Sequence, residues 1–82
     1  MSSFVSRHQQ EWDELATLVA RGRKSVRRLS PEDRERLDEL YRRTTVHLAR
    51  VSTRTQDQEL IRYLNQLAAA AHSLIYLPPR SS

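Results

Sequence analysis

The chain has 82 residues, of which 38% are hydrophobic, so it forms one domain at most and can bury only a small core. Its 14 Lys and Arg residues outnumber its 10 Asp and Glu residues, and the net charge of +4 permits contact with nucleic acid or anionic lipid without implying it. Because Cys is absent, disulfides, thiolate zinc sites and cysteine nucleophiles are excluded.

The composition favours helices along the whole chain. One Gly and three Pro leave few helix breakers, and no stretch sustains the alternation of apolar and polar residues that marks a half-buried strand. The N-terminus lacks the basic-then-apolar run of a signal peptide. The sequence also contains no run of about 18 apolar residues, which is the length needed to cross a bilayer. We therefore expect a chain that begins inside the cell and, taken alone, stays soluble in the cytoplasm.

The first helix is expected over residues 3–21, because apolar or aromatic residues recur there at steps of three and four. These residues are Phe4, His8, Trp12, Leu15 and Val19. Gly22 is expected to end the helix as a left-handed cap residue. A basic linker over residues 22–29 follows.

Basic residues gather around this linker. Five of the eight residues 21–28 are basic and none is acidic. One interpretation is that these cations are solvated and sit favourably at a helix C-terminus. The other is that they contact an anion or an acidic partner. The candidate anion contacts are Arg21, Arg23, Lys24, Arg27 and Arg28.

The second helix is expected over residues 31–52. Ser30 supplies a hydroxyl cap, Pro31 suits the first helical position, and two carboxylates follow at the positive end of the helix dipole. Its apolar stripe consists of Leu37, Leu40, Tyr41, Thr44, Leu48 and Val51. Opposite charges lie four residues apart in Glu32 with Arg36, Asp38 with Arg42, and Glu39 with Arg43. We interpret this charged face as solvated.

The third helix is expected over residues 56–77, capped either by Thr55 with Gln58 or by Asp57. Two prolines after it disfavour helical geometry, and residues 78–82 are expected to be a disordered tail. Nine of the eleven residues 67–77 are apolar, so two neighbouring helices are not expected to cover this helix completely. Its predicted interaction surface is Tyr63, Leu67, Ala70, Leu74 and Tyr76.

Three such helices with short connectors predict an all-α, three-helix antiparallel bundle. Self-association could complete this bundle by covering the third helix. Alternatively, the first two helices could fuse through the basic linker, and a second chain would then complete the core. The sequence leaves these arrangements open.

No catalytic, cofactor or metal site is expected. The histidines at positions 8, 47 and 72 fall on three different expected helices, and the absence of Cys also disfavours a zinc site. Asn65 and His72 share a stripe of the third helix, where we expect them to be buried and hydrogen-bonded within the core. A single Gly also excludes a phosphate-binding glycine loop, so we do not expect an enzyme.

Two kinds of binding module remain. A protein-interaction domain would use the third helix and bind a protein partner or a second copy of the chain. A nucleic-acid-binding module would use the basic residues 21–28, with anionic lipid as a related partner. Nucleic acid is disfavoured because the second helix carries five acidic residues among its first nine, and because aromatic residues fall on apolar stripes.

Several segments resemble the N-terminal region of the stage II sporulation protein M family, particularly its actinobacterial members. The matching residues are Glu11, Trp12, Leu15, Leu29, Ser30, Glu32, Leu40, Tyr41, Arg42, Arg43, Tyr63, Leu64, Asn65, Leu67, Ala71, His72, Ile75 and Tyr76. The resemblance implies a non-enzymatic cytosolic domain of a multi-pass membrane protein that assembles with other proteins at the membrane. It also implies that this chain is an excised domain. His47 departs from the pattern, where an acidic residue is expected.

Overall fold

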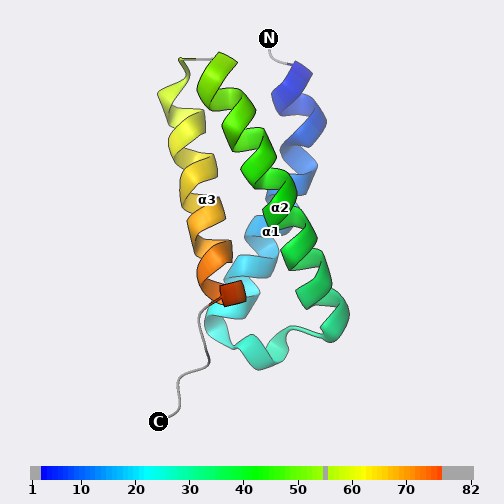
Figure 1. Cartoon of the computed structure of the whole chain (residues 1–82). Coiled ribbons are helices and arrows are strands. Elements are labelled where there is room, and N and C mark those ends of the chain that lie inside the picture. Colours follow the sequence, from blue (N-terminus) through cyan, green and yellow to red (C-terminus); the bar gives the residue numbers. More distant parts are fainter. Residues whose placement is uncertain (1–2, 55, 77–82) are drawn as a thin grey trace.

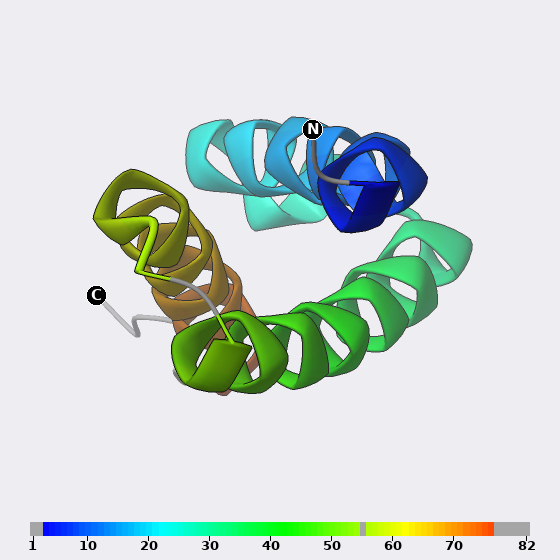
Figure 2. The same ribbon diagram turned by 90° about the horizontal axis from the view of Figure 1, so that it is seen from above.

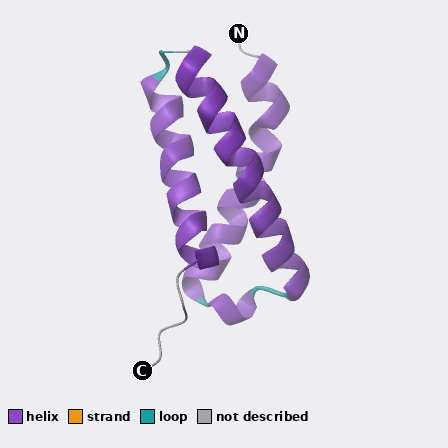
Figure 3. Ribbon diagram, in the orientation of Figure 1, coloured by secondary structure: helices purple, strands orange, loops and turns teal. Residues whose placement is uncertain are grey.

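Three long helices form the domain (Figures 1 and 3). The computed structural model describes residues 3–54 and 56–76. The helices are α1 (Ser3–Lys24), α2 (Pro31–Arg54) and α3 (Gln58–Tyr76), with a short 3-10 helix, η1 (Val26–Arg28), between the first two. α1 and α3 run in the same direction and α2 runs in the opposite one (Figure 1). The predicted three-helix antiparallel bundle is therefore confirmed.

Side-chain caps begin the second and third helices. The Ser30 hydroxyl oxygen accepts a hydrogen bond from the backbone N–H of Asp33 at 3.1 Å, as the sequence predicted. The Asp57 carboxylate accepts one from the backbone N–H of Leu60, also at 3.1 Å. Asp57 therefore caps α3. The alternative cap, Thr55, and the predicted tail at residues 78–82 lie outside the described residues.

The three helices surround a common centre (Figure 2), which apolar side chains fill. Trp12, Leu15, Leu40 and Leu64 contribute the largest fully buried hydrophobic side chains, so all three helices supply the centre of the core. Leu29, in the connector after η1, is also buried and closes one end. The connector is thus part of the fold, and α1 and α2 do not fuse into one helix.

Gly22 lies inside α1 and not at its end. The helix continues to Lys24, and no residue within 3–54 or 56–76 has a positive φ, so the predicted left-handed cap is wrong. A Cβ atom at Gly22 would lie 2.8 Å from Leu74 Cδ1 and 3.1 Å from Leu29 Cδ1. Close packing against these two leucine side chains therefore favours a glycine at this position inside α1.

Gly22→Ala is expected to lower the free energy of unfolding by about 1 kcal/mol, because an overpacking cost of about 1–3 kcal/mol exceeds the gain of about 1 kcal/mol in helix propensity. Urea denaturation of the purified domain measures this change. In a Leu74→Ala background the same substitution should cost less, because only the close contact with Leu29 Cδ1 remains. Stabilisation by Gly22→Ala in the unmodified chain would contradict the close approach.

Ion pairs join α1 to α2 along one side. They connect Glu14 with Arg36 at 2.7 Å, Glu11 with Arg43 at 2.9 Å, and Arg21 with Asp33 at 3.0 Å. The charged face of α2 is largely exposed, as interpreted, but it also forms ion pairs with α1 that the sequence did not indicate. The spacing of residues within one helix could not indicate these partners, because they depend on how α1 and α2 align.

Two of the three charge pairs predicted within α2 form. Arg42 contacts Asp38 at 2.9 Å, and Arg43 contacts Glu39 at 3.0 Å. Arg36 instead donates to both carboxylate oxygens of Glu14, at 2.7 and 2.9 Å, so the predicted pair with Glu32 is replaced. Hydrogen bonding from Arg36 lowers the pKa of the Glu14 carboxyl below its ordinary value.

Among the described helices, none is both long enough and apolar enough to cross a membrane.

Candidate functional site

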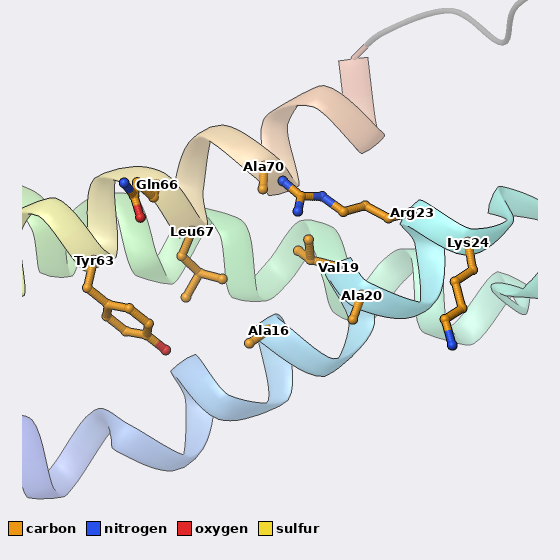
Figure 4. Close-up of a pocket in the computed structure, with 9 residues that line it drawn as sticks. All are labelled: Ala16, Val19, Ala20, Arg23, Lys24, Tyr63, Gln66, Leu67 and Ala70. Atoms are coloured by element: carbon orange, nitrogen blue, oxygen red, sulfur yellow. The ribbon is translucent and has the colours of Figure 1, made fainter.

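An open groove runs between α1 and α3 (Figure 4). Its volume is about 520 Å³. Residues of α1 line one side and residues of α3 the other. They are Ala16, Val19, Ala20, Arg23 and Lys24 from α1, and Tyr63, Gln66, Leu67 and Ala70 from α3. We call this feature the α1–α3 groove.

Small residues leave the groove open. Ala16, Ala20 and Ala70 project only a methyl group each, so neither helix fills the space between the two backbones. Val19 and Leu67 lie deeper and are buried, with 5% and 8% of their surfaces exposed. The groove therefore has an apolar base reached between small side chains, which is the form that accepts a closely packed helix or peptide.

The two ends of the groove differ in charge. Arg23 reaches from α1 towards Ala70 of α3, and Lys24 follows it at the same end (Figure 4). Tyr63 stands at the other end. Burial raises the pKa of the Tyr63 hydroxyl, and the nearby Asp13 carboxylate raises it further. The hydroxyl is consequently a neutral hydrogen-bond donor at pH 7, next to an acidic group.

The predicted interaction surface of the third helix divides into two parts. Tyr63, Leu67 and Ala70 line the α1–α3 groove. Leu74 instead packs against Gly22, and Tyr76 is 57% exposed on another side of α3. The ring of Tyr76 lies 4.7 Å from that of His72 and 6.1 Å from that of Tyr41, measured between centroids.

The candidate anion contacts also separate. Arg23 and Lys24 line the groove, whereas Arg21 forms its ion pair with Asp33. Arg27 and Arg28 are exposed on η1. The five cations therefore do not act as one patch, and only two of them border an apolar surface.

Sequence reasoning expected Asn65 and His72 to be buried in the core, and this prediction is wrong. Both side chains are exposed on α3. The core-facing stripe of α3 is instead formed by Leu64, Leu67, Ala68 and Ala71. These four residues form a complete helical face by themselves, so α3 is rotated with Asn65 and His72 pointing outward.

A cluster of polar side chains, which sequence reasoning missed, joins α1 to α2 away from the groove. The rings of His8 and His47 lie 3.9 Å apart between centroids. Oε1 of Glu11 is 3.8 Å from His8 Nδ1 and 3.9 Å from His47 Nε2. The spacing of three between His8 and Glu11 was visible in the sequence, but the approach of His47 depends on the packing of α2 against α1. We call these residues, with Trp12, the histidine cluster.

The histidine cluster holds three potential metal-ligand atoms within 4.8 Å of one another, but its hydrogen bonds do not suit a metal. The indole Nε1–H of Trp12 donates to His47 Nδ1 at 2.9 Å. Because the indole is only a donor, Nδ1 is unprotonated and the neutral ring carries its proton on Nε2. A metal on Nε2 would require that proton on Nδ1, facing the indole N–H. The arrangement therefore favours a neutral, hydrogen-bonded histidine.

The stability of the domain is expected to fall as the pH falls below about 6.5. Burial lowers the pKa of His47, and nearby His8, Arg50 and Arg43 lower it further, while Glu11 opposes them. The folded domain thus binds a proton at lower pH than the unfolded chain does. The stability contributed by neutral His47 is complete above the pKa of this residue in the unfolded chain. It is lost as the pH falls from that value through the lower pKa in the folded domain. Urea titrations at several pH values measure the effect.

His47→Gln should remove this part of the pH dependence, whatever its effect on overall stability. The matched control is His72→Gln, because His72 is exposed and should leave the dependence in place. Equal slopes of stability against pH for the unmodified domain and His47→Gln would contradict the assignment.

The fold and the groove together define a three-helix bundle domain with one open apolar face. The chain belongs to the family described as domain of unknown function DUF8413, whose model matches residues 2–77. No curated protein matches the chain, and no solved structure matches it. These comparisons do not test the resemblance to the stage II sporulation protein M family, which stays a prediction.

Proposed function

We propose that this domain is a non-enzymatic interaction module that binds a helical segment of another protein in the α1–α3 groove. The observation that carries the proposal is the apolar base of the groove, with Val19 and Leu67 reached between the methyl groups of Ala16, Ala20 and Ala70. Small residues along a helix pair allow a further helix to approach closely, and packing of apolar side chains then stabilises the complex.

Binding of nucleic acid is less well supported by the arrangement of charges. Arg36, Arg42 and Arg43 contact carboxylates, as does Arg21 in the basic segment. Phosphate contacts depend steeply on salt, so titration with duplex DNA at roughly 50 and 200 mM salt separates the two functions. We expect little binding at either concentration. Tight binding at the lower one that weakens sharply at the higher one would favour nucleic acid.

The resemblance to the stage II sporulation protein M family supports a setting at the cytoplasmic face of the membrane, as part of a larger membrane-embedded protein. That setting rests on the resemblance alone. The groove and its proposed partner do not depend on it.

Site-specific crosslinking in the source cells tests the groove. A photoreactive p-benzoylphenylalanine placed at Ala20, which is exposed in the groove, is expected to crosslink one partner. The control position is Ala49, which is exposed on α2. Mass spectrometry then identifies the crosslinked segment, which is synthesised as a peptide and titrated into the purified domain.

Substitutions at the same two positions complete the test. Ala20→Glu should abolish binding of that peptide, whereas Ala49→Glu should preserve it, and both should leave the fold intact because both sites are exposed. The proposal would be contradicted by an absence of adducts at position 20, by equal crosslinking at position 49, or by an unchanged affinity for Ala20→Glu.

A further inference from the structure

We infer that the helix bound in the α1–α3 groove runs antiparallel to α1 and α3, with acidic residues in its first turns and basic residues in its last turns. This inference deepens the proposed function and rests on it. A helix in this orientation would complete an up-down-up-down four-helix bundle.

The direction of the two groove helices supports the antiparallel arrangement. α1 and α3 run in the same direction, so both C-termini lie at the end of the groove that carries Arg23 and Lys24 (Figures 1 and 4). Helix C-termini carry partial negative charge and N-termini partial positive charge. A third helix beside these two is therefore favoured when its N-terminus lies at that end.

The basic end of the groove specifies the first turns of the bound helix. Arg21 and Arg36 are engaged by carboxylates, whereas within residues 3–54 and 56–76 neither Arg23 nor Lys24 forms an ion pair. Acidic side chains at a helix N-terminus are stabilised by that helix's own dipole. The same acidic residues would meet Arg23 and Lys24, so both effects favour one orientation.

The opposite end of the groove specifies the last turns. Asp13 is close enough to Tyr63 to raise the pKa of its hydroxyl. Glu59 is exposed one turn before Tyr63 on the same face of α3. These two carboxylates favour basic residues at the C-terminus of the bound helix, where the dipole also favours them. The charges at the two ends of the groove therefore favour the same orientation of the bound helix.

The length of the groove sets the length of the contact. From Ala16 to Lys24, which line the groove, α1 rises about 12 Å at about 1.5 Å per residue. A little over two turns of a bound helix would span this distance. The partner is thus an amphipathic segment of about 8 residues or more, with apolar residues of small and medium size on one face.

Two synthetic peptides of identical composition test the inference. Both are 18-residue amphipathic helices, acetylated and amidated, with Leu and Ala on one face; one has Glu in its first two turns and Lys in its last two, and the other has the reverse. We expect the Glu-first peptide to bind about tenfold more tightly at low salt. A spin label at its N-terminus should broaden the amide resonances near Arg23 more strongly than those near Tyr63.

Charge variants supply the matched control. Arg23→Gln with Lys24→Gln should reduce the preference for the Glu-first peptide, whereas Arg27→Gln with Arg28→Gln, which removes the same charge from η1, should not. Equal affinities for the two peptides, or stronger broadening near Tyr63 than near Arg23, would overturn the orientation while leaving the groove as a binding site. If neither peptide perturbs groove resonances, the proposed function itself fails.

Discussion

Leu67→Asp is expected to leave most of the domain unfolded at 25 °C. Leu67 is 8% exposed and connects the core to the base of the α1–α3 groove. Removing a buried leucine side chain costs about 2–5 kcal/mol, and burial of an unpaired carboxylate adds to that cost. Small domains have a total free energy of unfolding of about 5 kcal/mol or somewhat more.

Far-UV circular dichroism and urea denaturation measure the effect of Leu67→Asp. Gln66→Asp is the matched control, because it adds the same charge at the neighbouring exposed position of α3. We expect that variant to keep its helical signal and nearly its full stability. A Leu67→Asp variant with the urea midpoint of the unmodified domain would contradict the role of Leu67 in the core.

Trp12→Ala is expected to cost about 3–5 kcal/mol, because it removes the largest fully buried side chain of the core. Trp12 contacts two parts of the molecule. Its N–H donates to His47 Nδ1 at 2.9 Å, and its ring meets Tyr63 edge-on, with 6.4 Å between centroids. The substitution therefore weakens both the histidine cluster and one end of the groove.

Trp12→Phe separates the two contributions. Phenylalanine keeps most of the apolar volume but removes the hydrogen-bond donor, so a loss of about 1–3 kcal/mol is expected. Thermal and urea unfolding compare both variants with Tyr76→Ala, which removes an exposed aromatic ring and should cost less than about 1 kcal/mol. Similar stability for Trp12→Phe and the unmodified domain would show that the bond to His47 contributes little.

Local chemistry made the helices predictable. Ser30 and Asp57 cap their helices through bonds that span only three residues, so a short stretch of sequence contains all that is needed. The end of α1 was predicted wrongly because Gly22 packs against Leu74, which is more than fifty positions away in the sequence. A glycine that ends a helix and one that permits close packing look alike in sequence.

The candidate site was only partly predictable, for a related reason. Periodicity identified Tyr63, Leu67 and Ala70 as one face of the third helix, but it could not show which part of that face α1 would leave open. His47 could not be assigned to the histidine cluster, because its approach to His8 depends on the alignment of two antiparallel helices. The spacing of residues within one helix says little about which residues of another helix they contact.

Gly22 also lies beside the surface offered to a partner. Ala20, two residues earlier in α1, lines the groove, and Leu74, one turn after Ala70 in α3, supplies the atom nearest to position 22. A bulkier residue at position 22 would push first against Leu74 and so against α3. Because the methyl-lined space begins less than one turn from position 22, its width would then change, although none of its own residues had been altered.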